Sequence, residues 1–140
     1  MPRLPTLTDF TFSHSEYSAK GFLTDGTDKT FTIDIQVESE DEATLKKSLH
    51  TLSEVMSKLP DYEQKIASEL LELHNEEWKE EDADEIDEDE FTERIFLESI
   101  VINRDGSLVI YYNDGGLFCE HVIEVLVGAA LEFESADIAG

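Results

Sequence analysis

A run of carboxylates between two aromatic residues constrains this chain more than any other feature. The run reads WKEEDADEIDEDEF from Trp78 to Phe91, and Lys79 is the only cation within it. A packed interior cannot hold such a run, because each buried carboxylate would need a partner or a proton. The segment must therefore lie on the surface, and we expect Trp78, Ile86 and Phe91 to anchor it to the body of the protein.

The composition indicates one folded domain with a large negative charge. A chain of 140 residues with 40% hydrophobic residues and eight Phe is sufficient for one core. Asp and Glu number 34 against ten Lys and Arg, so the formal net charge is −24. This balance argues against nucleic acid or an anionic membrane as the partner, since phosphate binding needs clustered Lys and Arg. It favours a basic protein or a divalent cation.

Three further features favour a cytoplasmic protein. Cys119 is the only cysteine and cannot form an internal disulfide. The first residues lack the apolar core of a signal peptide. The longest uncharged apolar run, Val125–Leu131, is too short to span a bilayer. We therefore expect the protein to act in a reducing cytosol.

The hydrophobic pattern predicts a single α+β domain over residues 1–140. Alternating apolar residues predict strands within residues 8–38, most clearly at Phe31–Val37, with a turn at Asp25–Asp28. Residues 96–137 hold about four further strands, joined by turns rich in Gly, Asn and Asp. The expected sheet is largely antiparallel and has six to seven strands.

Helices are predicted between these two groups of strands. Residues 40–80 carry apolar side chains at helical spacing, and Ser39–Glu42 matches a capping box. Pro60 should end the first helix and Asp61 should cap the next, which predicts a helical hairpin. Residues 81–95 hold the acidic segment and a short third helix that Asp87 would cap.

The acidic segment does not match a calcium-binding loop. Counting from Asp82, carboxylates fall at positions one, three and twelve of an EF-hand loop, the last two being Asp84 and Glu93. Positions five and six are Ile86 and Asp87, where the loop requires an oxygen ligand and a glycine. The pattern leaves a solvated acidic face, with loose condensation of cations as the alternative.

Cys119 and His121 are the remaining candidates for chemistry. On a strand they would share a face, but two ligands do not make a structural zinc site. As a catalytic pair they lack a third group, and neighbouring carboxylates would raise the pKa of the thiol. We therefore predict no metal site, no cofactor and no catalytic residues, so the protein is not expected to be an enzyme.

Roughly the second half of the chain, from Leu70 to Gly140, resembles a bacterial family of uncharacterised domains. The pattern of that family is L-x-L-x-N-x-x-W, an acidic linker, F-x-x-R-(I/L)-x-L-x-S-I, a D-G-S hairpin, L-F-W-G-H-x-I-x-V and A-D-I-x-G. The chain departs from it at Cys119-Glu120, where the family has Trp-Gly. The matching residues are Leu71, Leu73, Asn75, Trp78, Phe91, Arg94, Ile95, Leu97, Ser99, Ile100, Asp105, Gly106, Ser107, Leu117, Phe118, His121, Ile123, Val125, Ala136, Asp137, Ile138 and Gly140.

In size and acidity, members of this family are similar to immunity proteins of bacterial toxin systems, including contact-dependent growth inhibition. The resemblance implies a cytosolic protein that binds and neutralises a cognate toxin, expected to be a basic protein of the nuclease type. A housekeeping domain whose acid serves solubility, and an acidic mimic of nucleic acid, are the alternatives. The expected partner-binding residues are Glu76, Glu77, Trp78, Glu80, Glu81, Asp82, Asp84, Glu85, Asp87, Glu88 and Asp89.

Overall fold

The computed structural model describes residues 4–22 and 30–139 and confirms the α+β class. The turn predicted at Asp25–Asp28 and the final Gly140 of the family pattern lie outside the described residues. The elements in chain order are a short helical turn at Leu7–Asp9, β1 (Thr11–Ser13), β2 (Glu16–Phe22), β3 (Thr30–Gln36), α1 (Glu42–Leu73), a π-helical turn η2 (His74–Trp78), α2 (Glu88–Arg94), β4 (Phe96–Ile102), β5 (Leu108–Asn113), β6 (Val122–Val127) and β7 (Phe133–Ala139).

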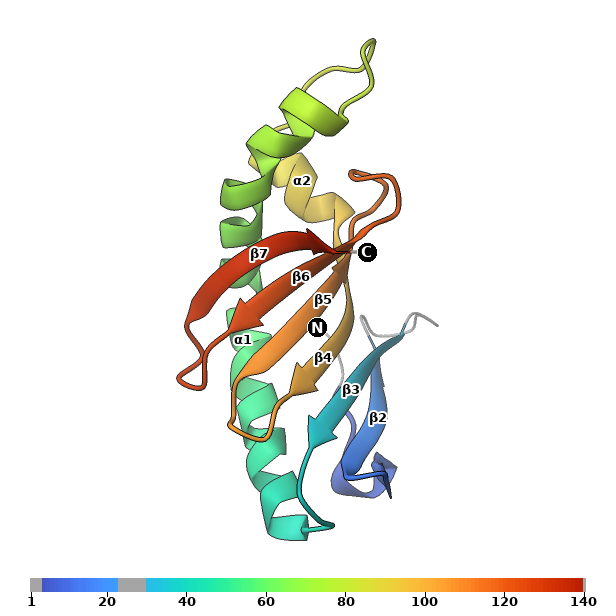
Figure 1. Ribbon diagram of the computed structural model, residues 1–140, viewed down its shortest axis with the longest axis vertical. Helices are drawn as coiled ribbons and strands as arrows, with labels where there is room; N and C mark the ends of the chain where they lie inside the picture. Colours follow the sequence, from blue (N-terminus) through green and yellow to red (C-terminus); the bar gives the residue numbers. More distant parts are fainter. Residues whose placement is uncertain (1–3, 23–29, 140) are drawn as a thin grey trace.

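The strands form one sheet in the order in which they occur along the chain (Figure 1). Neighbouring strands are antiparallel except β3 and β4, which run parallel because the chain between them crosses over through α1 and α2. The predicted sheet of six to seven strands is therefore confirmed. Within the described part of the chain, β1 and β7 form the edges, and β3 is an interior strand.

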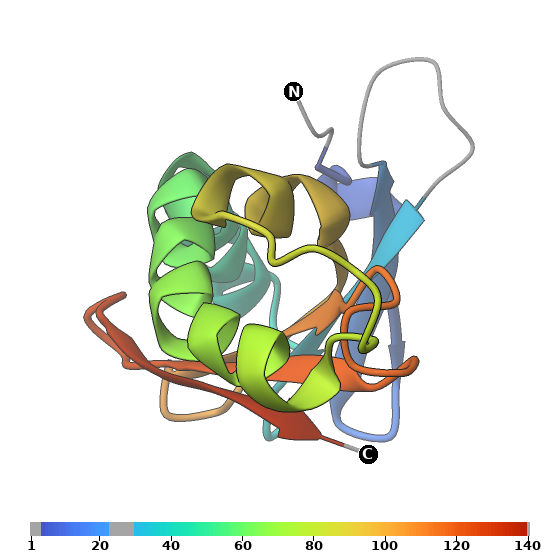
Figure 2. The ribbon, with the colours of Figure 1, turned by 90° about the horizontal axis from the view of Figure 1, so that it is seen from above.

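Both helices pack on the same side of the sheet, which curls around them (Figure 2). The inward side chains of β3, Phe31, Ile33 and Ile35, are essentially inaccessible, while Thr32 between them is exposed. This is the period of two that the sequence shows at this strand. Similarly buried residues outside β3 are Leu52, Val55, Ile66, Phe91, Ile100, Ile110, Phe118, Ile123 and Val125.

The predicted helical hairpin is wrong, because α1 continues without a break through Pro60. Leu45, Leu52, Leu59 and Ile66 are seven residues apart, and all four are buried against the sheet. A single helix keeps this stripe on one side, so packing outweighs the helix-breaking tendency of proline. Pro60 is exposed, and the hydrogen bond that it cannot donate is lost on the solvent side.

The capping predictions for α1 also need correction. Asp61 lies inside α1 and pairs with Lys65 at 3.8 Å, so it caps nothing. The residue that caps α1 is Asp41, whose carboxylate accepts a hydrogen bond from the Ala43 amide at 3.1 Å. The predicted cap of the short helix is confirmed, because Asp87 accepts from the Glu90 amide at 2.9 Å.

A polar pair connects α1 to the sheet within the core. The Tyr112 hydroxyl donates to Glu63 Oε2 at 2.8 Å. Burial raises the pKa of Tyr112 well above its ordinary value, so the phenol remains protonated and able to donate. Burial also raises the pKa of Glu63, and the hydrogen bond from Tyr112 partly opposes that rise.

This pair leads to a prediction about pH. The pKa of Glu63 is higher in the folded protein than its ordinary value of 4.5, so the folded state binds more protons between these two values. The free energy of unfolding therefore falls as pH rises through that window. Repulsion between the carboxylates of a chain of net charge −24 also lowers the free energy of unfolding as the pH rises. We expect a higher Tm at pH 5 than at pH 7, measured by circular dichroism.

The control is Glu63→Gln, which should flatten part of this pH dependence. Hydrogen bonds lower the pKa of Asp41 and Asp105, through Thr44 and Ser107 respectively. Their contribution is lost as the pH falls below their ordinary value of 3.8, so the Tm should decline again in stronger acid. A Tm that decreases steadily from pH 7 downwards would contradict the prediction.

Candidate functional site

The acidic segment projects from one end of the long axis, opposite the start of α1 (Figure 1). The chain leaves the π-helical turn η2 after Trp78 and re-enters helix at α2. We call residues 76–90, all of whose carboxylates are exposed, the acidic platform. Of the predicted partner-binding residues, Trp78 is half-buried and the others are exposed, namely Glu76, Glu77, Glu80, Glu81, Asp82, Asp84, Glu85, Asp87, Glu88 and Asp89.

The three expected anchors hold the acidic platform on the body of the protein. Phe91 is fully buried, and Trp78 and Ile86 are half-buried against the core. Asn75 acts as a clamp on the middle of the segment through two hydrogen bonds of 3.1 Å. Its Nδ2 donates to the Ile86 carbonyl, and its Oδ1 accepts from the Ile86 amide. The backbone of the acidic platform is therefore fixed at its start, in its middle and at its end.

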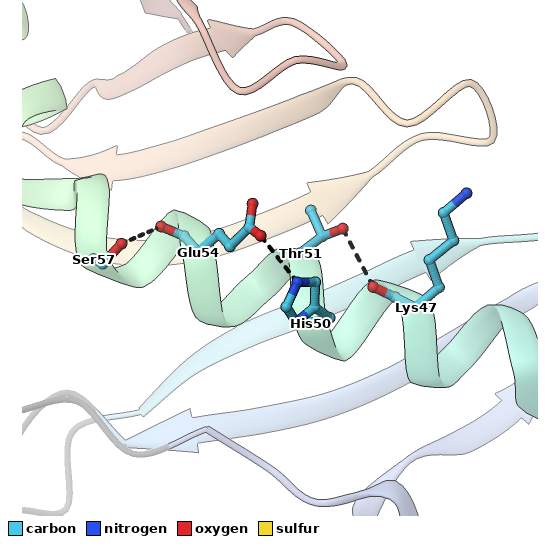
Figure 3. A network of polar contacts seen from close by, with 5 residues as sticks. All are labelled: Lys47, His50, Thr51, Glu54 and Ser57. Carbon is cyan, nitrogen blue, oxygen red and sulfur yellow. Dashed lines mark hydrogen bonds and ion pairs between the residues drawn. The ribbon is translucent and has the colours of Figure 1, made fainter.

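The carboxylates of the acidic platform are not neutralised by ion pairs in the described part of the chain. The ion pairs there, Glu42–Lys46, His50–Glu54 and Asp61–Lys65, all lie within α1, and Figure 3 shows the second of them, at 3.0 Å. Lys79, the cation inside the segment, donates to the backbone carbonyls of Glu80 and Ala83, at 3.2 and 2.8 Å. The negative charge of the platform thus remains available to a partner.

The loop between β5 and β6 lies against this segment and is built around Asp114. The Asp114 side chain is 1% exposed. Its Oδ1 accepts from the Gly116 amide at 3.0 Å, and its Oδ2 accepts from the Phe118 and His121 amides at 2.9 and 3.1 Å. A carboxylate that pairs with three backbone amides fixes the path of the loop. One of the turns rich in Gly, Asn and Asp that the sequence predicts within residues 96–137 is therefore present in this loop.

Glycine is required at position 115 of this turn. Gly115 has a φ of +60°, and a Cβ there would lie 2.1 Å from the carbonyl oxygen of Arg94. The close approach lets the Arg94 guanidinium donate to the Gly115 carbonyl at 3.2 Å. The end of α2 and the β5–β6 loop are in this way joined.

Phe118 is the centre of an aromatic cluster beneath the acidic platform. Trp78 meets Phe118 edge-on at 5.7 Å between ring centroids, and it meets His121 at 5.4 Å. His74 and Phe91 also contact Phe118, at 5.7 and 6.2 Å. Edge-to-face contacts of this kind add to the stabilisation that burial provides. Trp78 is thus held in one orientation by rings from other elements.

A pocket of about 430 Å³ lies between the acidic segment, α2 and the β5–β6 loop. It brings together four of the predicted residues, Trp78, Glu80, Asp84 and Glu85. The other predicted residues lie outside its lining, namely Glu76, Glu77, Glu81, Asp82, Asp87, Glu88 and Asp89. The lining residues that the sequence did not mark as a site are His74, Lys79, Ala83, Ile86, Glu90, Arg94, Gly116 and Cys119.

His74 forms part of the pocket wall, and a hydrogen bond fixes the orientation of its ring. The side chain is 7% exposed, and its Nδ1 lies 2.8 Å from the carbonyl oxygen of Leu117. A carbonyl only accepts, so Nδ1 carries a proton and Nε2 of the neutral ring is an acceptor. No partner for Nε2 lies among the described residues, and none of their fully buried polar side-chain atoms lacks a partner. Nε2 therefore keeps some exposed area, on a side chain that lines the pocket.

The expectation that Cys119 and His121 share the face of a strand is wrong. Both lie in the β5–β6 loop, where Cys119 and Glu120 have φ values of 58° and 67°. Cys119 is exposed, and Nδ1 of His121 contacts the carbonyl oxygen of Phe118. In residues 4–22 and 30–139, no three His, Cys, Asp or Glu side chains are grouped to hold a metal ion. No helix in these ranges has the length and apolar character to cross a membrane.

The left-handed backbone at Glu120 leads to a second prediction. Glycine adopts a φ of 67° freely, whereas a residue with a side chain loses about 1 kcal/mol in this conformation. Glu120→Gly should therefore raise the free energy of unfolding by up to about 1 kcal/mol, measured by urea denaturation. Glu120→Ala removes the same charge but keeps the Cβ, so it should gain less than half as much. Equal gains for both variants would assign the effect to charge.

A family model described as uncharacterized proteins conserved in bacteria (DUF2262) matches residues 5–138. The match covers both groups of strands, α1, the acidic platform and the β5–β6 loop. No curated protein and no solved structure matches the chain. Because the match includes nearly the whole sequence, the chain belongs to this bacterial family, DUF2262.

Proposed function

We propose that this protein is an immunity protein, which acts in the cytoplasm by binding and neutralising a cognate basic toxin through the acidic platform. The observation that supports this most is the combination of fixed backbone and unpaired charge. Asn75 clamps the segment at Ile86, while the carboxylates around that clamp have no ion-pair partner in the described structure. A surface with this arrangement presents negative charge in a constant geometry.

The physical requirements of toxin inhibition fit such a surface. An inhibitor must bind before the toxin causes damage, and opposite electrostatic fields raise association rates by orders of magnitude. A nuclease holds the phosphates of its substrate with Lys and Arg. Carboxylates of the acidic platform would pair with those side chains and block access of the substrate. This inhibitory role requires no catalytic group in the chain itself.

Coexpression tests this function directly. The proposal expects a large secreted protein to be encoded directly upstream of this chain, and the C-terminal domain of that protein is then the toxin to test. Expression of that domain alone should stop growth, and coexpression of this chain should restore it. The purified pair should bind at least tenfold more weakly at 500 mM than at 50 mM salt. Toxicity that persists with this chain present, or binding indifferent to salt, would refute the proposal.

A further inference from the structure

We propose that the pocket beside Trp78 receives the side chain of one arginine from the protein partner. The inference rests on the proposed function and names the group that would anchor the complex. The pocket lies inside the acidic platform, with Trp78 and Ile86 in its lining. A volume of about 430 Å³ admits one long side chain, since pockets of roughly 300–1,000 Å³ hold small ligands.

A ligand of this pocket must first of all offer a hydrogen-bond donor. Nε2 of His74 is an acceptor, it belongs to a side chain that is 7% exposed, and it has no partner among the described residues. The donation of Nδ1–H to the Leu117 carbonyl, at 2.8 Å, fixes the ring in this tautomer. A ligand that offers an N–H group would satisfy this atom, and a ligand with acceptors alone would not.

The second requirement is for positive charge. Four carboxylates line the pocket, those of Glu80, Asp84, Glu85 and Glu90, against the two cations of Lys79 and Arg94. Both cations are already engaged with backbone carbonyls, Lys79 with Glu80 and Ala83, and Arg94 with Gly115. The lining therefore has a net negative charge, which disfavours an anionic ligand and favours a cation.

Guanidinium fits these requirements better than ammonium does. Its five N–H donors lie in one plane, so it can serve Nε2 of His74 and a carboxylate of the rim at the same time. Its flat face also stacks on an aromatic ring, and Trp78 supplies such a ring in the pocket. An ammonium group is more strongly hydrated and presents a point charge, so it gains less from a half-buried site.

The fluorescence of Trp78 reports directly on this pocket, because it is the only tryptophan in the chain. The probe is arginine with an acetylated amine and an amidated carboxyl group, and the comparison is lysine capped in the same way. We expect saturable quenching with capped arginine and at least threefold weaker binding of capped lysine. Equal affinities, or no saturable change in fluorescence, would overturn the inference.

Two variants on α2 form a matched pair. Glu90 lines the pocket, whereas Glu93 lies on the same short helix outside the lining, and both are exposed. Glu90→Gln should weaken capped arginine about three- to tenfold, and Glu93→Gln should change its affinity less than twofold. Equal effects of the two substitutions would mean that general attraction to negative charge explains the binding, and the pocket would be rejected.

A third variant tests the His74 acceptor. In His74→Asn the side-chain amide is placed to donate to the Leu117 carbonyl, as Nδ1 does, but nothing occupies the position of Nε2. We expect a loss of affinity for capped arginine of at least threefold with little change for capped lysine. If His74→Asn fails to fold, the unaltered protein is titrated with capped arginine whose guanidinium nitrogens are fully methylated, which keeps the charge but has no N–H group to donate. Binding as tight as that of capped arginine would count against the acceptor role.

The cognate toxin separates this inference from the proposed function. If the toxin binds in a salt-dependent manner and neither Glu90→Gln nor His74→Asn weakens the complex, the arginine pocket is wrong and the immunity role stands. If capped arginine binds as described but the toxin does not, the immunity role is wrong and the pocket stands. An arginine scan of the toxin should find one position whose replacement by lysine weakens the complex at least tenfold.

Discussion

Replacement of Asp114 by alanine is expected to lower the free energy of unfolding by about 3–5 kcal/mol. Three backbone amides, those of Gly116, Phe118 and His121, lose their acceptor in this variant. Each buried donor without a partner costs about 1–3 kcal/mol, and the Phe118 amide is fully enclosed. Native domains have a total stability of about 5–15 kcal/mol, so the loss would be a large fraction of it. Urea denaturation measures the change.

The effect should extend from the loop to the pocket, since Phe118 holds Trp78 in place through a ring contact at 5.7 Å. A variant that loosens the loop should therefore also shift the emission of Trp78 in the folded state. Asp114→Asn is the control, because its single oxygen can retain part of the hydrogen bonding. It should lose less stability than Asp114→Ala. A loss below about 1 kcal/mol in the alanine variant would show that water replaces the carboxylate.

Neutralisation of the acidic platform is expected to have the largest effect on binding. In the variant that carries Glu80→Gln, Glu81→Gln, Asp82→Asn, Asp84→Asn and Glu85→Gln, affinity for the cognate toxin should fall about 100-fold or more at low salt. Stability should remain the same or rise, because self-repulsion decreases and the five side chains are exposed. Isothermal titration calorimetry at two salt concentrations measures the affinity and its salt dependence.

The matched control removes five charges from exposed carboxylates elsewhere. The control residues are exposed and lie outside residues 76–90, namely Glu38 and Glu40 just before α1, Glu42 and Glu54 in α1, and Glu134 in β7. Figure 1 shows that the start of α1 is opposite the acidic platform. Their joint replacement by Gln should change toxin affinity less than tenfold. If both variants lose affinity equally, net charge explains the effect, and if neither does, the acid serves solubility alone.

Local patterns in the sequence predicted the strands and the surface position of the acidic segment. The alternation at Phe31, Ile33 and Ile35 predicted β3, because a strand with one covered face has a period of two. The anchoring role of Phe91 also followed from an apolar residue at the end of a run that cannot be buried. Such predictions depend on neighbours in the chain, so they need no knowledge of the rest of the fold.

The predicted helical hairpin is wrong because the local effect of one proline is smaller than the packing of a long apolar stripe. Pro60 opposes helix locally, but the stripe from Leu45 to Ile66 runs through it with an unchanged spacing of seven residues. Packing of that stripe against the sheet exceeds the cost of one lost hydrogen bond on the solvent side.

The pocket, in contrast, depends on contacts between residues far apart in the chain. The ring of His74 is oriented by its hydrogen bond to the Leu117 carbonyl, and Arg94 at the end of α2 contacts Gly115. In both pairs, the two residues come from different segments of the chain. No spacing in the sequence relates these positions, because their separation is set by how α1, α2 and the β5–β6 loop pack. Trp78, Ile86 and Phe91 are local signals that the acidic segment is attached to the core, but they do not indicate a pocket.

The sequence by itself determined where charge must lie and which residues alternate between core and solvent, because burial of a carboxylate without a partner is too costly in any fold. Only the tertiary structure decided that α1 is one helix and that four of the predicted residues share a pocket with His74. Those features arise from long-range packing, which selects among local conformations that differ little in energy.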